Sequence, residues 1–219
     1  MPKSASILAL VSGDRRILDA HLAAVKSTMS QLVERQFAES RNYERSRSGE
    51  PQKTGNLVYA LFAHDTSRAL DPQGHIHAVV ANLTRDPKGT WKALWNGEIW
   101  KNNTTIGQFY HAAFRAQLQK LGYETEAVGK HGSFEIKGVP AEVIKEFSQR
   151  REDILTKVEE LGISSPKGQD RVTVTTRDPK LAVEDRTGLI QSWQDRSAQL
   201  GFDGKAPIAE AKARAELEA

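Results

Sequence analysis

The chain of 219 residues contains no cysteine. Disulfide bonds and thiolate metal sites are therefore excluded, and a reducing compartment is the expected setting. The chain also lacks an apolar run long enough to span a bilayer, and its opening residues do not form a secretory signal. These absences predict a cytoplasmic protein, and the length suits one domain or one domain with an appendage.

Aromatic residues are few, at 7% of the chain, whereas charged residues make up 27%. This balance is typical of a protein with extensive polar surface. The formal net charge is only +3, although the isoelectric point lies near 9.1. A basic isoelectric point favours an acidic partner, but a net charge this small excludes little.

The most informative feature is a group of three histidines, His64, His75 and His77, among the six in the chain. Residues 57–63 and 77–81 are rich in apolar and β-branched side chains and are predicted to form strands. Because side chains alternate along a strand, His75 and His77 are expected to share one face. His64 lies at the exit of the first predicted strand.

A turn-forming segment at 71–74 separates the two predicted strands and is long enough to bring them side by side. Three imidazoles would then meet on a rigid sheet, an arrangement that suits a divalent metal with coordination positions left open for water or substrate. The alternative is that the histidines are polar surface, because a His-x-His pair on a strand is often no more than that.

The rest of the chain alternates between helical and strand patterns. The opening residues are expected to enter a helix capped by Ser4 or Ser6, and His21 lies on the apolar stripe of the next helix, where packing is the expected role. Residues 207–219 are predicted to form a weak, exposed helix. The other expected helices are 14–36, 104–121, 140–161 and 186–200, and the other expected strands are 37–43, one that starts near residue 53, 124–128 and 133–136.

Trp91, Trp95 and Trp100 lie among lysines, and a basic turn precedes them at 44–51. Aromatic side chains interleaved with cations suit stacking on unpaired bases beside phosphate contacts. The alternative is that the tryptophans anchor a hydrophobic core. Both interpretations are open from the sequence.

Taken together, several segments resemble the conjugative relaxase domain of the TraI/TrwC type, a group of histidine–hydrophobe–histidine nicking enzymes. The resemblance implies an α+β fold, a two-layer sandwich with an antiparallel sheet backed by helices, plus a C-terminal helical extension. It divides the chain into an incomplete relaxase catalytic core at 1–162 and a fingers-like helical extension and tail at 163–219. The matching segments are Pro-Lys-Ser-Ala-Ser at 2–6, Lys-Thr-Gly-Asn-Leu at 53–57, His-Asp-Thr-Ser-Arg at 64–68, His-Ile-His-Ala-Val-Val-Ala-Asn at 75–82, Leu-Gly-Tyr-Glu-Thr at 121–125 and Gly-Lys-His-Gly at 129–132.

The resemblance also implies a function. In such enzymes three histidines, matched here by His64, His75 and His77, hold a divalent ion (Mg, Mn or Zn) that polarises the scissile phosphate at a plasmid transfer origin. A tyrosine attacks that phosphate, and a carboxylate orients one histidine. Single-stranded DNA at the origin is therefore the expected partner. The residues expected to contact it are Lys3, Thr66, Arg68, Arg177 and Lys180.

The sequence departs from the family pattern at its start. The nucleophilic tyrosines and the carboxylate strand of such domains precede the segment matched at 2–6, and the four tyrosines present do not replace them. We therefore expect an N-terminally truncated relaxase without catalytic residues of its own, inactive alone, with a vacant sheet position beside the histidine strand. A separate N-terminal relaxase fragment is a further candidate partner. A metal-water-dependent nuclease and a non-functional remnant are the alternatives.

Overall fold

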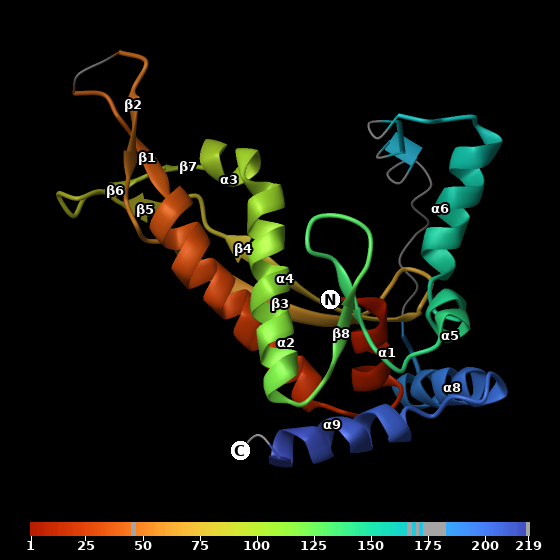
Figure 1. The fold of residues 1–219 in the computed structure, drawn as a ribbon. Coiled ribbons are helices and arrows are strands. Elements are labelled where there is room, and N and C mark those ends of the chain that lie inside the picture. The colour runs from red at the N-terminus through yellow and green to blue at the C-terminus, as the bar shows by residue number, and fades with distance from the viewer. Residues whose placement is uncertain (45–46, 166–167, 170, 173–182, 218–219) are drawn as a thin grey trace.

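The computed structural model describes residues 1–44, 47–165, 168–169, 171–172 and 183–217 (Figure 1). None of the helices in these ranges is both long and apolar enough to cross a bilayer. The helical segments are α1 (Lys3–Leu10), α2 (Arg16–Ser27), the π-helical η1 (Thr28–Phe37), α3 (Gly97–Lys101), α4 (Asn103–Lys120), α5 (Ala141–Glu146), α6 (Gln149–Glu160), α8 (Arg186–Gln199) and α9 (Lys205–Leu217). The strands are β1 (Glu39–Asn42), β2 (Glu50–Lys53), β3 (Tyr59–Thr66), β4 (Pro72–Val80), β5 (Thr84–Arg85), β6 (Trp91–Lys92), β7 (Leu94–Trp95), β8 (Thr125–Ala127) and β9 (Phe134–Ile136).

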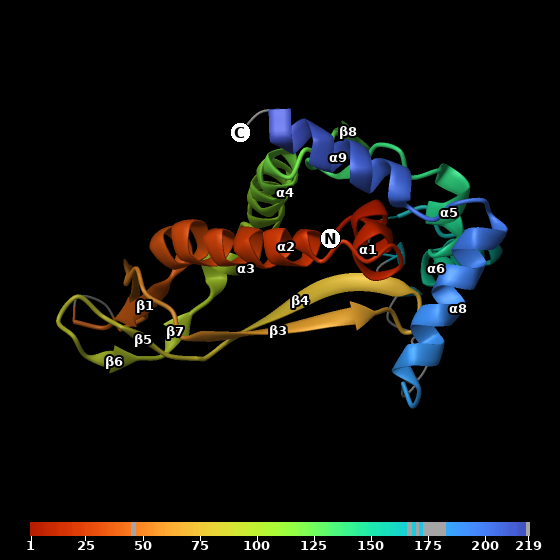
Figure 2. The ribbon, with the colours of Figure 1, turned by 90° about the horizontal axis from the view of Figure 1, so that it is seen from below.

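The fold is a mixture of helices and small antiparallel sheets, which confirms the expected α+β class. The strands form one three-stranded sheet, β2-β1-β7, and three two-stranded sheets, β3-β4, β5-β6 and β8-β9. Helices α1 and α2 lie over one side of the β3-β4 sheet, and α4 packs beside α2 (Figure 2). The β3-β4 hairpin is thus one layer and the N-terminal helices are the other.

The hairpin that carries the histidines is longer than the sequence predicts. β3 continues past His64 to Thr66, and β4 begins at Pro72, so the predicted turn at 71–74 is wrong. The reversal lies in the residues between the two strands, with an irregularity in register between His64 and Thr66. This longer hairpin moves His64 and His75 from the mouth of a turn into paired strand positions, where the backbone fixes their side-chain directions.

A core of apolar side chains joins the N-terminal helices to the rest of the chain. Its fully buried members include Ile7 and Leu8 of α1, Phe114 of α4 and Trp193 of α8. Because α8 and α9 both contribute side chains to this cluster, the C-terminal helices pack on the same core as α1. The division at residue 162 stays a prediction.

Ser4 and Ser6 are buried within α1, so their predicted role as helix caps is wrong. The Ser4 hydroxyl accepts a hydrogen bond of 2.7 Å from the Ile136 backbone N–H, and the Ser6 hydroxyl donates one of 3.2 Å to the Pro2 carbonyl. The Ser6 hydroxyl also accepts a hydrogen bond of 3.1 Å from the Gly74 N–H of β4, so the two hydroxyls tie α1 to β9 and β4.

The predicted helix at 140–161 is two helices, α5 and α6, which meet at Phe147 and Ser148. Phe147 is fully buried, and the break lets its ring enter the core while α6 leaves in a new direction. A pattern of apolar spacing cannot reveal such a break, because both halves keep helical periodicity.

The helix predicted at the C-terminal end is present as α9, and most of its residues are exposed, but the expectation that it is exposed on every side is wrong. Helix α9 packs against the end of α4, where Ala211 is fully buried and the Arg214 Nε donates a hydrogen bond of 2.8 Å to the Gly122 carbonyl. The close approach depends on Gly122, whose φ of +81° and missing side chain leave room for the α9 backbone.

The expected vacant sheet position lies along one edge of β4. Among the residues that the structure describes, β3 is the one strand that pairs with β4. The start of the chain covers part of the other edge: the Met1 amino group donates to the Gly74 carbonyl at 3.0 Å, and the Lys3 Nζ donates to the Pro72 carbonyl at 3.1 Å. The edge beyond Gly74 has no strand neighbour within the described ranges.

Candidate metal and nucleic-acid site

The three histidines converge on one face of the β3-β4 hairpin. His64 is paired directly with His75 across the two strands, and His77 lies two residues further along β4. Their ring centroids are 5.4 Å apart for His64 and His75, 4.9 Å for His64 and His77, and 5.0 Å for His75 and His77. The convergence predicted from the sequence is therefore present, on a hairpin with a different turn.

The donor set suits one divalent ion. With metal–nitrogen bonds of about 2.0–2.1 Å, three imidazoles around one ion have ring centroids roughly 5 Å apart, which is the spacing found here. The rings of His64 and His75 are nearly parallel, however, with an interplanar angle of 20°. Within the described part of the chain, no group of three His, Asp or Glu side chains is already oriented to hold an ion. Binding therefore requires the rings to turn about their side-chain torsions.

A hydrogen bond fixes which ring nitrogen carries the proton in one of the three imidazoles, His75. The His75 Nδ1 lies 2.9 Å from the Gln73 carbonyl oxygen. A carbonyl oxygen only accepts, so Nδ1 carries the hydrogen and Nε2 is the nitrogen with a free lone pair for a metal. Such a backbone contact is the usual way in which a protein orients a metal-binding histidine.

His64 and His75 line a cavity of about 1220 Å³ between the hairpin and helices α1, α2 and α8. Its apolar wall comes mainly from Leu10, Leu18 and Ile190, and its polar wall includes the two histidines. Asp65 and Arg186 form an ion pair at its rim, between the end of β3 and the start of α8. A cavity of this size and mixed polarity has room for several groups of a ligand beside the imidazoles.

His21 also lines this cavity, and the prediction that it is a packed residue is confirmed. Its side chain is buried, and its Nδ1 lies 2.9 Å from the Tyr110 hydroxyl. Burial, together with the nearby positive N-terminus and His75, lowers the pKa of His21 to about 3. This imidazole is therefore neutral at physiological pH.

The residues predicted to contact DNA occupy different environments. Lys3 is half-buried and donates to the Pro72 carbonyl, and burial lowers the pKa of its amine. Thr66 is buried at the end of β3, whereas Arg68 is exposed in the turn that follows. Arg177 and Lys180 lie outside the described residues. The DNA-contact roles of all five remain predictions.

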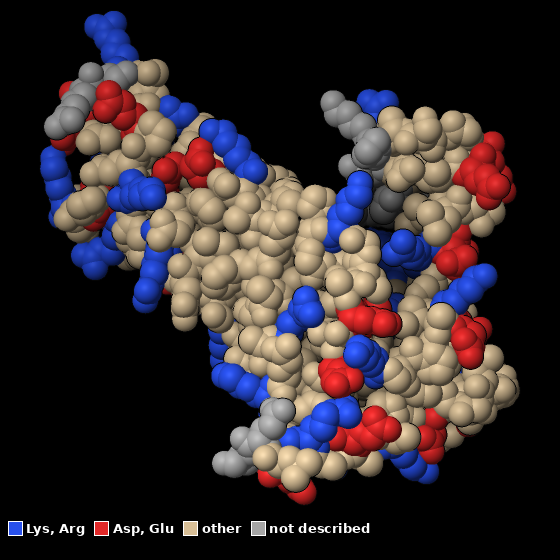
Figure 3. Space-filling view, viewed as in Figure 1, with Lys and Arg blue, Asp and Glu red and all other residues tan. Residues whose placement is uncertain are grey.

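Trp91, Trp95 and Trp100 are all exposed, so the interpretation that they anchor a core is wrong. The Arg41 guanidinium carbon lies 3.7 Å from the centre of the Trp95 ring, and Arg85 lies 5.6 Å from that of Trp91. These side chains come from the end of the molecule formed by β1, β2, β5, β6 and β7, where Lys and Arg project on several sides with Asp and Glu between them (Figure 3). Aromatic faces and cations thus meet on solvent-exposed strands.

A second cavity, of about 800 Å³, lies between the β8-β9 hairpin and α6. Its walls carry Lys3, Lys130, Arg150 and Arg151, and the turn that links the histidine strands contributes Asp71 to it. The histidine hairpin and its turn therefore contribute residues to two cavities, one beside the imidazoles and one with several basic side chains in its lining.

All four tyrosines are among the described residues, and none lines the histidine cavity. The hydroxyls of Tyr110 and Tyr123 are hydrogen-bonded to His21 and Asp14, respectively. Burial raises the pKa of both phenols. Tyr43 is exposed beside the β1-β2 hairpin, and Tyr59 begins β3.

The sequence did not indicate Arg41 or Asp71 as partners of a site. Arg41 lies just before the basic turn at 44–51, and Asp71 is the first residue of the predicted turn at 71–74. Their partners, Trp95 and Arg196, are far along the chain. No local pattern links residues separated in this way.

Comparison with known proteins gives a consistent result. The family model described as TrwC relaxase matches residues 1–200. Two curated relatives, both named multifunctional conjugation protein TraI, from Escherichia coli and from its strain K12, are each 39% identical over 225 residues. The alignment covers 99% of this chain and 12% of each relative, so the chain spans about an eighth of their length.

Comparison with solved structures points to the same family as the sequence comparisons. TrwC complexed with a 27-mer DNA comprising the recognition hairpin and the cleavage site is 38% identical, with a TM-score of 0.86 over 94% of this chain and 73% of that one. A metal-bound structure of relaxase TrwC with oriT DNA is 38% identical, with a TM-score of 0.85 over 93% of this chain and 70% of that one. From its sequence and its fold, this chain belongs to the TrwC relaxase family.

Proposed function

We propose that this chain binds a divalent ion through His64, His75 and His77 and holds single-stranded DNA of a plasmid transfer origin against that ion. The observation that carries the proposal is the convergence of three imidazoles beside a cavity of about 1220 Å³. Its support is the similarity to TrwC structures with bound oriT DNA, two of which also contain bound metal.

A bound ion would supply Lewis-acid polarisation of a phosphate oxygen. The chain's own groups prepare that step. The Gln73 carbonyl holds the proton of His75 on Nδ1, and the paired strands fix the positions of His64 and His75. Of the three candidate ions Mg, Mn and Zn, a set of three imidazole donors favours Zn, because Mg and Mn prefer oxygen ligands.

The DNA would be held by groups that recognise a phosphate backbone and unpaired bases. The exposed rings of Trp91 and Trp95 offer stacking surfaces, with Arg85 and Arg41 beside them. Lys130, Arg150 and Arg151 supply positive charge in the second cavity. Stacking and phosphate contact of this kind favour a single strand over a duplex, whose bases are already stacked.

We further propose that the chain alone does not cleave the strand. Transfer to a tyrosine needs a phenol near the metal-bound phosphate. The Tyr123 side chain is buried, that of Tyr110 is partly buried, and both hydroxyls are in hydrogen bonds. Burial raises the pKa of both phenols, which makes them poor nucleophiles near neutral pH. A second relaxase polypeptide that carries the nucleophile is the proposed partner for cleavage.

The metal proposal is tested by calorimetric titration of the full chain with Mn²⁺ and, separately, Zn²⁺. Replacing His64, His75 and His77 together by alanine should weaken binding at least about 100-fold, because each lost imidazole removes a metal bond. The matched control is His131→Asn, which removes an exposed imidazole in a hairpin where φ is +61°, a conformation that asparagine tolerates. Equal binding by the triple variant and the wild type would refute the proposal.

The cleavage proposal is tested with a labelled origin oligonucleotide and Mn²⁺ on a denaturing gel. We expect neither a shortened strand nor a protein–DNA adduct. An adduct would show that a tyrosine of this chain does attack, whereas a shortened strand without adduct would point to hydrolysis by metal-activated water.

A further inference from the structure

The turn that joins the two histidine strands has a strained backbone. Leu70, between His64 and His75, has a φ of +58°, a left-handed conformation that is unfavourable for a residue with a side chain. Three hydrogen bonds close the turn. The Ser67 N–H donates to the Asp71 carbonyl at 2.9 Å, the Leu70 N–H to the Ser67 carbonyl at 3.2 Å, and the Asp71 N–H to the Ser67 hydroxyl at 3.1 Å. A turn of this kind persists only where its surroundings hold it.

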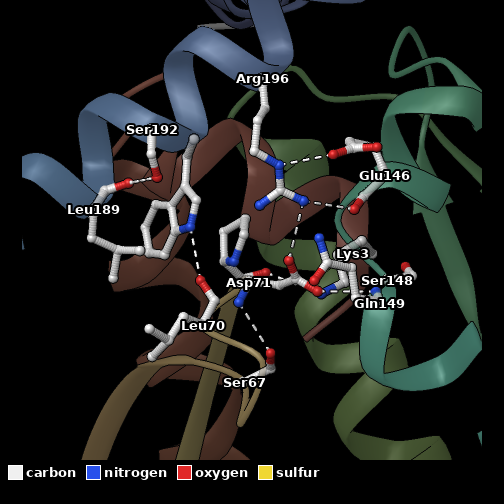
Figure 4. A network of polar contacts seen from close by, with 12 residues as sticks. Lys3, Ser67, Leu70, Asp71, Glu146, Ser148, Gln149, Leu189, Ser192 and Arg196 are labelled. Carbon is white, nitrogen blue, oxygen red and sulfur yellow. Dashed lines mark hydrogen bonds and ion pairs between the residues drawn. The ribbon is translucent and has the colours of Figure 1, made fainter. Parts of the chain in front are cut away.

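Helix α8 holds the turn at Leu70. The Trp193 Nε1 donates a hydrogen bond of 2.8 Å to the Leu70 carbonyl, and the Trp193 ring is 1% exposed (Figure 4). The strained residue is therefore fixed by a buried donor from a helix that lies more than 100 residues further along the chain.

The next residue is held from two directions. The Asp71 carboxylate, 1% exposed, accepts hydrogen bonds from the Gln149 N–H at 3.0 Å and from the Arg196 guanidinium at 3.4 Å. Arg196 is itself held by Glu146, whose carboxylate and carbonyl accept from it at 2.8 Å and 2.9 Å. Figure 4 shows Arg196 between Glu146 and Asp71, so one guanidinium joins α5, α8 and the turn.

A third contact lies at the same end of the hairpin, just before the turn. Arg186, the first residue of α8, pairs with Asp65, which adjoins His64. Helix α8 therefore contacts the histidine hairpin next to His64 and again at Leu70 and Asp71.

We propose that Trp193, Arg196 and Asp71 form a turn clamp that keeps the strand ends beside the paired His64 and His75 from shifting, and thereby raises the affinity of the proposed metal site. The three are positioning residues, because each acts through the turn and none is a ligand. The inference rests on the proposed metal binding by the histidines. Without the clamp, Leu70 would relax towards an ordinary conformation and the strand ends would shift. Outer groups that orient metal ligands are typically worth about 10- to 100-fold in metal affinity.

The experiment compares Trp193→Phe and Asp71→Asn in the full chain. Trp193→Phe keeps an aromatic ring and removes the Nε1 donor. Asp71→Asn keeps the shape and an oxygen for the Gln149 N–H, and removes the charge that faces Arg196. For each variant we expect Mn²⁺ affinity by calorimetry to fall about 10-fold. The visible absorption of bound Co²⁺, which reports ligand geometry, should also change.

The matched control is Tyr123→Phe, which removes one buried hydrogen bond, to Asp14 and not to a residue of the turn. It should lose stability without losing Mn²⁺ affinity or altering the Co²⁺ spectrum. Wild-type affinity and spectrum in both Trp193→Phe and Asp71→Asn would overturn the clamp, as would an equal loss in Tyr123→Phe. Failure of the wild type to bind Mn²⁺ would instead refute the proposed function, so the two failures are distinguishable.

Discussion

At the scale of single residues, burial decides what each imidazole can do. His64, His75 and His77 are on a hairpin face that is at least partly open, where a cation can reach them. His21 is a buried residue of α2 and contacts the hydroxyl of Tyr110, which lies on α4. The same side-chain type therefore serves as a candidate ligand in one place and as a neutral packing group in the other.

The neutral state of His21 predicts a pH dependence of stability. Its folded pKa of about 3 lies below the value of 6.5 for an unfolded chain. Between these values the unfolded state binds more protons, so the contribution of His21 is complete above pH 6.5 and is lost as pH falls towards 3. Urea unfolding with a chelator present should show that lowering the pH from 7 to 5 costs the wild type about 2 kcal/mol more than His21→Gln. Identical losses in both proteins would mean that His21 is protonated in the fold.

At the scale of elements, the close contact between Gly122 and the backbone of α9 fixes the position of this C-terminal helix. A side chain at Gly122 would overlap the Ala211 carbonyl of α9, and its φ of +81° already disfavours any other residue. Gly201 ends α8 with a similar φ of +70°, but a Cβ there would meet nothing within 4 Å. Comparing substitutions at these two glycines therefore separates the energetic cost of backbone strain from the cost of disturbed packing.

We expect Gly201→Ala to lower the free energy of unfolding by about 1–2 kcal/mol, from strain alone. Gly122→Ala should cost a further 1–3 kcal/mol or so, because α9 must move away from α4. Chemical denaturation measures both. If the two substitutions cost the same, α9 does not depend on close contact at Gly122.

The second prediction at this scale concerns Trp95 of β7, at the end of the molecule formed by β1, β2, β5, β6 and β7. Trp95→Ala should weaken binding of fluorescein-labelled oligothymidine roughly 5- to 150-fold, because a stacked base is worth about 1–3 kcal/mol. Trp100→Ala is the matched control: its ring is more exposed, and within the described residues no Arg lies over it. Fluorescence anisotropy at a fixed salt concentration measures the affinity of each protein for the oligonucleotide. Equal affinities for wild type and Trp95→Ala would remove this surface from the DNA site.

Residue patterns predicted most elements and the three-histidine group. The apolar runs at 57–63 and 77–81 gave the hairpin, and alternation placed His75 and His77 on one face. What the patterns did not reveal depends on contacts between distant residues. The turn at Leu70 is fixed by Trp193, the break at Phe147 by burial of its ring, and the order of α9 by Gly122. Local spacing contains no record of such contacts.

At the scale of the whole molecule, the N-terminal helices, the hairpin and the C-terminal helices form one support for the imidazoles. The core joins Ile7, Phe114 and Trp193, and Trp193 in turn holds the turn between His64 and His75. A change far from the histidines, in α8, is therefore expected to reach the metal site through packed and hydrogen-bonded neighbours.

The central claim is that His64, His75 and His77 bind one divalent ion together. Crystals of the chain soaked in Mn²⁺ test it most directly, through the anomalous scattering of manganese. We predict one peak within about 2.2 Å of a ring nitrogen of each of the three histidines. A peak beside only one of the rings, or no peak at the hairpin under saturating Mn²⁺, would contradict the claim.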